Sequence, residues 1–239
     1  MRSKHMAHAE QDIERQSMSS GWHTVAVFDL DGTITRHDTY LRYLIGYLRH
    51  QPSRLLSTLS LPVDLLRFAL GAVDNAYVKA RFLEAILAGH SRAELGVWTA
   101  TFLDTLCQRD LRPGALARIA QHRAQGDRLI LATASFDFYV QPLAQRLGFD
   151  EVICTQSLWN TDDRLLGGLN GPNCYGVVKL NRLYELLGTD RRDVSLLAYS
   201  DHHADLPLLT AATRAVAVNP TRKLHAAAVL YGFSIENWG

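Results

Sequence analysis

The sequence predicts an α/β fold: helices cover both faces of a mostly parallel sheet, and a small all-α unit is inserted near the start. Two observations predict it. First, short apolar runs rich in β-branched residues alternate with helical patterns over most of the chain. Second, the alternation is interrupted once, between residues 30 and 128, where apolar residues recur at helical spacing without a strand pattern.

The first predicted strand, 24–30, reads TVAVFDL and is almost wholly apolar until it ends in acid. Strands buried on both faces show such continuous apolar runs, so this strand is expected near the centre of the sheet. Similar runs predict four more strands, at 128–133, 151–155, 194–199 and 214–218. Helices are predicted at 136–147, 176–187, 204–212 and 221–230. Turn residues and a glycine pair within 157–168 predict a β-hairpin.

The inserted unit is predicted to be a helical cap. Four of its segments place apolar residues at helical spacing, at 41–48, 55–70, 77–87 and 93–106. The second segment carries a stripe of Leu55, Leu59, Val63, Leu66 and Leu70. We interpret this stripe as the internal face of a four-helix cap, and contact of 55–73 with acyl chains or a lipid interface is the alternative. The expected domains are a leader at 1–21, a core at 22–36 and 112–239, and the cap at 37–111.

The composition is that of an ordinary globular protein and gives no sign of a polyanionic partner. The 239 residues include 25 Lys and Arg and 24 Asp and Glu, so the net charge of +1 would not attract a nucleic acid or a membrane by bulk charge. Three cysteines without paired spacing predict free thiols. The N-terminus shows no signal-peptide pattern, and Pro62, Asp64 and Arg67 interrupt the most apolar stretch. A cytoplasmic location is therefore expected, and the oligomeric state stays open.

The residues suited to chemistry follow the predicted strands. Asp29 and Asp31 end the first strand, Thr133 ends the second, and Asp201 and Asp205 follow the fourth. Ligands of open parallel sheets bind beyond the carboxyl ends of the strands, so these side chains are expected to converge. Carboxylates at that density repel one another unless a cation lies among them, and hard oxygen ligands favour Mg²⁺. The sequence therefore predicts a magnesium site.

Four motifs occur in a fixed order: Asp29-Leu30-Asp31-Gly32-Thr33, then Thr133, then Lys179, then Asp201 with Asp205. This order, with a helical insertion after the first motif, resembles the haloacid dehalogenase superfamily of phosphatases and phosphotransferases, and the resemblance covers about residues 25–220. The spacing of Cys174, Gly176 and Lys179 is similar to that of its phosphoserine-phosphatase-like members. The resemblance implies a Rossmann-like three-layer core with an inserted all-α cap.

The resemblance also implies catalytic roles. Asp29 matches the nucleophile that forms an aspartyl-phosphate. Asp31 matches the general acid that protonates the leaving alcohol and then activates water. Thr133 would donate to a phosphoryl oxygen, and Lys179 would neutralise the charge of the aspartates and the phosphoryl group.

The cofactor implied is Mg²⁺, with the Asp29 carboxylate, the main-chain carbonyl of Asp31 and the Asp201 carboxylate as ligands. Asp205 would be an adjacent or water-mediated ligand. Gly32 and Thr33 would support the loop, the glycine by allowing a tight turn.

Some positions depart from the phosphoserine phosphatase pattern and bear on the substrate. Asp38 stands where those enzymes carry a glutamate that meets the substrate's amino group, so both a contact with a cationic group and a plain helix-start role are open. Ser200 occupies the usual place of a glycine, and the first motif ends in Gly32-Thr33 where phosphoserine phosphatases have Ser-Thr. A substrate other than phosphoserine is expected. His202 and His203 are expected to face solvent, since an oxygen-rich Mg²⁺ site has little need of imidazole.

The predicted function is a Mg²⁺-dependent phosphatase that acts on a small phosphorylated metabolite. A phosphotransferase is an alternative, because the motifs do not distinguish water from an alcohol as acceptor. A lipid-phosphate phosphatase is another, because residues 28–33, 44–52 and 198–201 are similar to bacterial phosphatidylglycerophosphate phosphatases. From a different class, a phospho-acceptor signalling domain is disfavoured because it would need neither Asp31 nor an inserted cap, and a non-catalytic binding protein is disfavoured because all the catalytic positions are intact.

Overall fold

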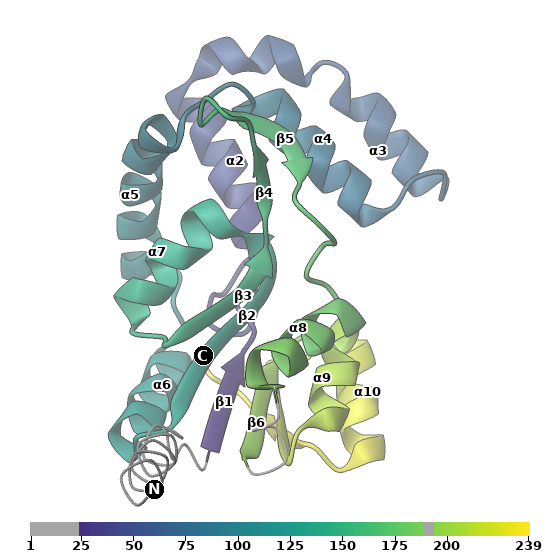
Figure 1. The fold of residues 1–239 in the computed structure, drawn as a ribbon. Helices are drawn as coiled ribbons and strands as arrows, with labels where there is room; N and C mark the ends of the chain where they lie inside the picture. The colour runs from purple at the N-terminus through teal and green to yellow at the C-terminus, as the bar shows by residue number, and fades with distance from the viewer. Residues whose placement is uncertain (1–23, 189–193) are drawn as a thin grey trace, which may run out of the picture.

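The computed structural model describes residues 24–188 and 194–239 and confirms the α/β fold (Figure 1). The predicted leader at 1–21 lies outside the described residues. The main sheet consists of β1 Thr24–Phe28, β2 Arg128–Phe136, β3 Glu151–Thr155, β6 Ser195–Ser200, β7 Arg214–Val218 and β8 Ser234–Glu236. All pairings are parallel, in the order β3-β2-β1-β6-β7-β8.

The first strand lies in the middle of the sheet, as its apolar sequence predicts. Val27 of β1 pairs with Ile130 on one side and with Ala198 on the other. The ladder continues one residue past the strand, because the Asp29 N–H donates to the Tyr199 carbonyl over 2.9 Å. All five predicted strands are present, whereas β8 was not predicted, since three residues at a sheet edge give too short a pattern.

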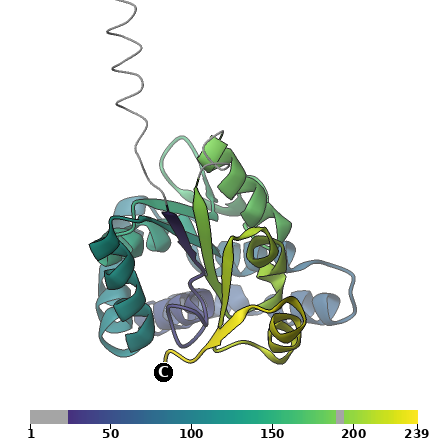
Figure 2. The same cartoon turned by 90° about the horizontal axis from the view of Figure 1, so that it is seen from below.

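Helices cover both faces of the sheet, which gives the three layers seen in Figure 2. The apolar cores alternate along the strands: Ala26 and Phe28 pack on one face, and Val25 and Val27 pack on the other. The first face is covered by α6 Pro113–Gln125 and α7 Asp137–Leu147. The second is covered by α8 Val177–Leu187, α9 Leu206–Ala211 and α10 Arg222–Tyr231. The predicted helix 204–212 starts as a 3₁₀ turn, η3 His203–Asp205, and continues as α9. Helix α6 was not predicted from the sequence.

The insertion after β1 is helical, as predicted, and lies beyond the carboxyl end of β1 (Figure 1). It comprises α2 Thr39–His50, the 3₁₀ segment η1 Pro52–Thr58, α3 Leu61–Ala69, α4 Asn75–Leu87 and α5 Arg92–Arg109. Tyr43 of α2 is fully buried, stacks on Tyr139 of α7 at 5.1 Å and meets Phe102 of α5 edge-on at 5.0 Å. This aromatic cluster joins the cap to the core.

In the described part of the chain, no helix has the length and apolar character needed to cross a membrane.

The prediction that the leucine stripe of 55–70 faces the cap interior was wrong. The segment is divided into η1 and α3, and Pro62, which has no N–H to donate, lies in the first turn of α3. The break changes the face that packs, so Leu61 and Asp64 are the buried residues of α3. The predicted stripe is exposed instead, with relative exposures of 52% for Leu55, 75% for Leu59, 61% for Val63, 60% for Leu66 and 75% for Leu70.

The predicted hairpin is present and packs against the cap. It consists of β4 Ser157–Trp159 and β5 Leu165–Leu169, paired antiparallel. Gly167 has φ +86°, and a Cβ there would lie 2.4 Å from the Glu84 Cα of α4, so only glycine permits this close approach. The Leu165 N–H also donates to the His90 carbonyl over 2.9 Å. The expected domain boundaries assign this hairpin to the core, and that division stays a prediction.

Candidate active site

The predicted site residues converge beneath the cap. A cavity of about 720 Å³ lies over the carboxyl ends of β1, β2 and β6. The predicted residues that line it are Asp29, Asp31, Gly32, Asp38, Thr133, Lys179, Asp201 and Asp205. Thr33 is fully buried and hydrogen-bonds to two of them, Asp29 and Asp201. Residues far apart in the sequence thus meet because their strands end at one edge of a parallel sheet.

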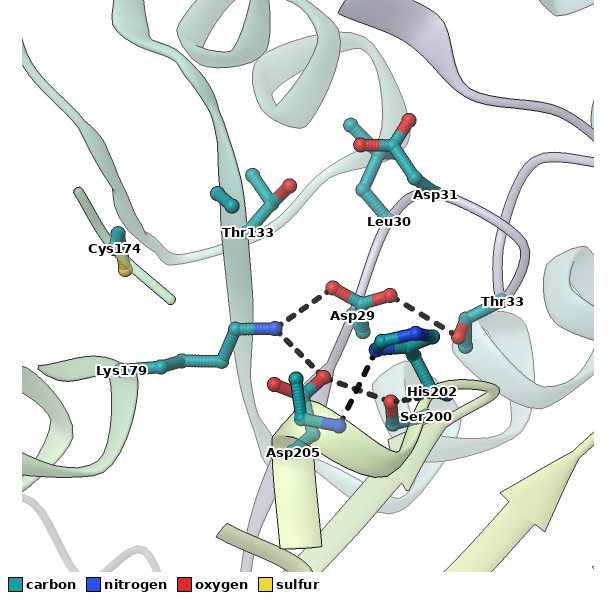
Figure 3. Close-up of polar contacts among 12 residues, drawn as sticks. Asp29, Leu30, Asp31, Thr33, Thr133, Cys174, Lys179, Ser200, His202 and Asp205 are labelled. Carbon is teal, nitrogen blue, oxygen red and sulfur yellow. Dashed lines mark hydrogen bonds and ion pairs between the residues drawn. The ribbon is translucent and has the colours of Figure 1, made fainter. Parts of the chain in front are cut away.

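Lys179 is the buried cation among these carboxylates (Figure 3). Its Nζ donates to Asp29 Oδ1 over 2.8 Å and to Asp205 Oδ2 over 2.7 Å. Burial alone would lower the pKa of Lys179, but Asp205 and Asp29 outweigh it and raise that pKa, so the ammonium stays charged. Ser200 Oγ donates to the same Asp205 oxygen over 2.7 Å. Asp205 therefore holds Lys179 against Asp29.

Asp29 and Asp201 carry more negative charge than Lys179 offsets. Burial raises the pKa of Asp29 well above its usual range; Lys179 opposes this, and Asp205 and Asp201 add to the increase. Burial and the neighbouring Asp205 raise the pKa of Asp201 to about 7. Shifts of this kind, from several carboxylates in one cleft, are typical of functional sites.

The loop after β1 places Asp201 against Asp29. Gly32 has φ +82°, and a Cβ there would lie 2.3 Å from Asp201 Oδ2, so a side chain at position 32 would displace that carboxylate. Thr33 Oγ1 accepts from the Asp201 N–H over 2.9 Å and lies 3.3 Å from Asp29 Oδ2 and 3.4 Å from Asp201 Oδ1. Both residues of the predicted glycine-threonine pair thus bring two carboxylates together.

The donor set fits a hard divalent cation. Among the residues that the structure describes, no three His, Cys, Asp or Glu side chains are grouped so that they could hold a metal ion. The predicted ligands include only two side chains, Asp29 and Asp201, with the Asp31 carbonyl as a third oxygen. Mg²⁺ commonly takes one or two carboxylates and completes its shell with water and substrate oxygens. Excess negative charge and oxygen-only donors therefore support the predicted metal.

The Asp31 side chain occupies a separate environment from Asp29 (Figure 3). Its Oδ1 accepts from the Thr39 N–H over 2.6 Å, and its Oδ2 accepts from Ser135 Oγ over 2.7 Å. Burial and the nearby Asp38 raise the pKa of Asp31, whereas these hydrogen bonds lower it. Because Thr39 starts the first cap helix and Ser135 lies near the end of β2, the carboxyl group is held between cap and core. It faces the same cavity as Asp29.

Thr133 lies at the cavity with its hydroxyl oriented by the chain. Its Oγ1 accepts from the Ser135 N–H over 3.1 Å, which leaves the hydroxyl proton free to donate to another acceptor.

Gly176 at the start of α8 has φ +60° and ψ −129°, a conformation that favours glycine, and this turn begins the helix that carries Lys179.

The expectation that His202 and His203 face solvent was wrong: both are half-buried, and His202 lines the cavity, as Asp38 does. Asp38 Oδ1 accepts from the Leu41 N–H over 2.6 Å and so caps α2, although the residue also lines the cavity. His202 Nδ1 accepts from the Ala204 N–H over 3.2 Å. Burial and the His203 ring, whose centroid is 4.3 Å away, lower the pKa of His202. These contacts stabilise the loop after β6.

The residues of the site that were not predicted include two serines, a threonine and a lysine. Ser135 and Ser200 lie at strand ends, which is a signal that could have found them. Thr39 holds Asp31 through its main-chain N–H, and its buried hydroxyl lies 3.4 Å from Ser135 Oγ and 3.2 Å from the Tyr139 hydroxyl, contacts that only the packing of α2 on the core reveals. Lys79 of α4 reaches down from the cap, and its Nζ donates to the Ala134 carbonyl over 2.9 Å. Burial lowers the pKa of Lys79, Asp31 and Asp38 oppose this, and the residue lines the cavity. Only the packing of the cap reveals this contact.

Comparisons with known proteins agree with this geometry. The family model of haloacid dehalogenase-like hydrolases matches residues 26–210. Protein CicA of Caulobacter vibrioides is 32% identical over 188 residues, which cover 79% of this chain and 82% of CicA. A histidinol-phosphatase of Neisseria meningitidis serogroup C is 26% identical over 226 residues, covering 90% of this chain and 98% of that protein.

Solved structures share the fold. A protein of unknown function from Bordetella pertussis Tohama I matches with a TM-score of 0.80 and 27% identity, covering 91% of this chain and all of that one. Structures of phosphoserine phosphatases also match, at 15% to 20% identity and TM-scores of 0.51 to 0.67, a likeness that shows the fold alone. By its motifs, its fold and the family model that spans most of its length, the chain belongs to the haloacid dehalogenase-like hydrolases.

Proposed function

We propose that the protein is a Mg²⁺-dependent phosphomonoester phosphatase that works through an aspartyl-phosphate on Asp29. The observation that carries this proposal is the pair of carboxyl groups two residues apart with different partners. Asp29 is bonded to the Lys179 ammonium, whereas Asp31 is held by an N–H and a hydroxyl. Carboxyl groups in unlike environments can divide the work of nucleophile and acid. The family and the histidinol-phosphatase relative support the reaction class.

In the first half-reaction, an Asp29 carboxylate oxygen attacks the phosphorus and the bond from phosphorus to the ester oxygen breaks. Asp31 gives its proton to that oxygen, so a neutral alcohol leaves. Lys179 and the Thr133 hydroxyl stabilise the charge on the phosphoryl oxygens. Mg²⁺, held by Asp29, Asp201 and the Asp31 carbonyl, would supply further charge neutralisation when bound.

In the second half-reaction, Asp31 takes a proton from water as the water oxygen attacks the phosphorus. The bond between phosphorus and the Asp29 oxygen breaks, which releases inorganic phosphate and restores the carboxylate. Asp31 is then protonated again for the next turnover. The hydrogen bonds from Thr39 and Ser135 keep its carboxyl group in one place through both steps.

Trapping the intermediate tests the proposal. The protein is incubated with Mg²⁺ and a phosphomonoester with a good leaving group, 4-nitrophenyl phosphate labelled on phosphorus, and quenched in acid. Label should remain on the wild-type protein, be released by hydroxylamine as expected for an acyl phosphate, and accumulate further in Asp31→Asn because water activation is lost. Asp29→Asn should carry no label. Turnover without any label on the protein, or label retained in Asp29→Asn, would contradict the mechanism.

The same assay separates the alternatives that the sequence leaves open. A phosphotransferase should form a new phosphate ester when an acceptor alcohol is added, at the expense of phosphate release. Replacing Mg²⁺ with a chelator should abolish phosphoenzyme formation if the metal has the proposed role. The small phosphorylated metabolite and the cytoplasmic location expected from the sequence stay predictions.

A further inference from the structure

An apolar groove lies beside the catalytic cavity and shares residues with it. The groove has a volume of about 260 Å³ and runs between α2, η1, α3 and α4. Leu41, Leu65 and Phe82 line both the groove and the catalytic cavity, so the two spaces adjoin. Thr58 is the only polar residue among those that line the groove, and none of them is charged. A polar substrate alone gives no reason for such an extension.

The outer cap face, which we define as Leu55, Leu56, Leu59, Val63, Leu66 and Leu70, belongs to η1, α3 and the residues that end them. These six residues are 52% to 78% exposed. Monomeric soluble proteins rarely show apolar surface gathered in this way, and such patches mark interaction sites. Because η1 and α3 carry both the outer cap face and part of the groove wall, the exposed apolar surface lies close to the groove.

Basic side chains outnumber acidic ones around the outer cap face. Between residues 49 and 74, the basic side chains are Arg49, Arg54 and Arg67, and the acidic ones are the buried Asp64 and the exposed Asp74. Asp64 is buried and pairs with Arg81 of α4 over 3.1 Å, so it presents little negative charge to solvent. Exposed leucines flanked by arginines are typical of segments that lie on anionic lipid surfaces.

We infer that the substrate is a phosphomonoester with a long apolar chain, which the groove receives while the outer cap face rests on an anionic lipid surface. The inference depends on the proposed phosphatase activity and names its substrate class: it favours the lipid-phosphate alternative over the small metabolite expected from the sequence. The phosphate would lie at Asp29, and the chain would leave the catalytic cavity past Leu41, Leu65 and Phe82. A second copy of the protein could also cover an apolar face, but it would not account for a groove that adjoins the catalytic cavity.

A series of n-alkyl phosphates from propyl to decyl, each below its micelle concentration, tests the groove. The ester chemistry is constant and only the chain changes. Burying one methylene contributes enough free energy to change kcat/KM by about fourfold at most. We expect kcat/KM to rise by about two- to fourfold per methylene until the groove is filled. A flat or falling series would overturn the inference.

Two variants that carry the same kind of substitution test the groove further: Ile45→Asp changes a groove residue, and Val97→Asp is the control outside the groove. Ile45 lines the groove and is 39% exposed, whereas Val97 is on α5 and is 70% exposed. The ratio of kcat/KM for decyl and propyl phosphate should fall by at least about tenfold in Ile45→Asp, because a carboxylate opposes burial of the chain. That ratio should be unchanged in Val97→Asp. An equal ratio in the two variants would contradict the groove assignment.

Co-sedimentation with vesicles of equal parts phosphatidylcholine and phosphatidylglycerol tests the outer cap face. The wild-type protein should bind these vesicles, and Leu59→Asp should weaken binding by at least about tenfold. The control is Leu230→Asp on α10 of the core, a residue 79% exposed against 75% for Leu59, and it should bind as the wild type does. A wild-type protein that stays in solution would overturn the lipid part of the inference. So would a dimer that Leu59→Asp dissociates in sedimentation velocity.

The two proposals fail in different ways. If neither 4-nitrophenyl phosphate nor any alkyl phosphate is hydrolysed, the proposed function fails and the substrate class fails with it. If the esters are hydrolysed with Mg²⁺ but chain length has no effect, only the inference on the substrate class fails.

Discussion

The catalytic edge of the sheet and the cap differ in the kind of side chain that each buries or exposes. At the edge, polar groups are buried and bonded to one another, as Lys179 is to Asp29 and Asp205. On the cap, apolar groups face outward, as Leu56 and Leu59 do with exposures of 78% and 75%. A buried, mutually bonded set has one low-energy arrangement, which suits chemistry. An exposed apolar surface suits the recognition of another molecule.

This difference makes a general prediction about substitutions. Changes at the sheet edge should act mainly on kcat, because those residues hold the reacting groups. Changes in the cap should act mainly on KM and on the choice of substrate. The following variants test that division, from the largest expected effect to the smallest.

Asp29→Asn should have the largest effect. Loss of the proposed nucleophile should lower phosphate release by at least about a thousandfold. The variant should remain folded, because it removes one of the carboxylates that repel Asp201 and Asp205. Phosphate release and thermal unfolding followed by circular dichroism measure both results. Activity within about tenfold of the wild type would exclude Asp29 as the nucleophile.

Lys179→Met should lower both activity and stability. Turnover should fall by about a hundredfold or more, because the phosphoryl charge loses its buried ammonium. The free energy of unfolding should fall by about 3–5 kcal/mol, since Asp29 and Asp205 are left buried without their cation. Urea denaturation measures the second effect. Lys223→Met, at an exposed lysine of α10, is the control and should change neither quantity.

Gly32→Ala should weaken the response to metal. Its Cβ would lie 2.3 Å from Asp201 Oδ2, so that carboxylate must move. We expect the half-saturating Mg²⁺ concentration for phosphate release to rise by about tenfold or more. Gly71→Ala is a matched control: its φ of +72° imposes a similar backbone penalty, but nothing lies within 4 Å of the added Cβ. An equal metal response in both variants would show that backbone strain alone is responsible.

The same division explains what the sequence could predict. Asp29 and Asp201 follow apolar strands and Thr133 lies near the end of another; parallel strands bring their carboxyl ends to one edge, so the convergence follows from strand order. Ser135 and Ser200 lie at the ends of two of these strands, but a serine is common enough that its position gives little signal without its partners. Their hydrogen bonds to Asp31 and Asp205 appear only when the loops are placed.

The cap was harder to predict because periodicity identifies a helix but not its neighbour. The leucine spacing of 55–70 is helical, yet the segment divides at Ser60, before Pro62, and α3 packs through Leu61 and Asp64. A charged residue at a buried position does not fit an apolar stripe. Its partner, Arg81, lies on another helix, so the pairing depends on tertiary structure. The exposed face therefore emerged only from the structure.

Lys79→Met should have the smallest effect and is the sharpest test of the division between edge and cap. Lys79 belongs to the cap, yet its Nζ reaches the Ala134 carbonyl next to Thr133. If it only aligns the cap on the core, KM should rise by about fivefold while kcat stays within about twofold. Arg92→Met, an exposed cap residue paired with Asp163, is the control and should change neither value. A fall in kcat as large as that of Lys179→Met would mean that Lys79 contacts the phosphoryl group. The residues that take part in catalysis would then include one from the cap, and would not be confined to the edge of the sheet.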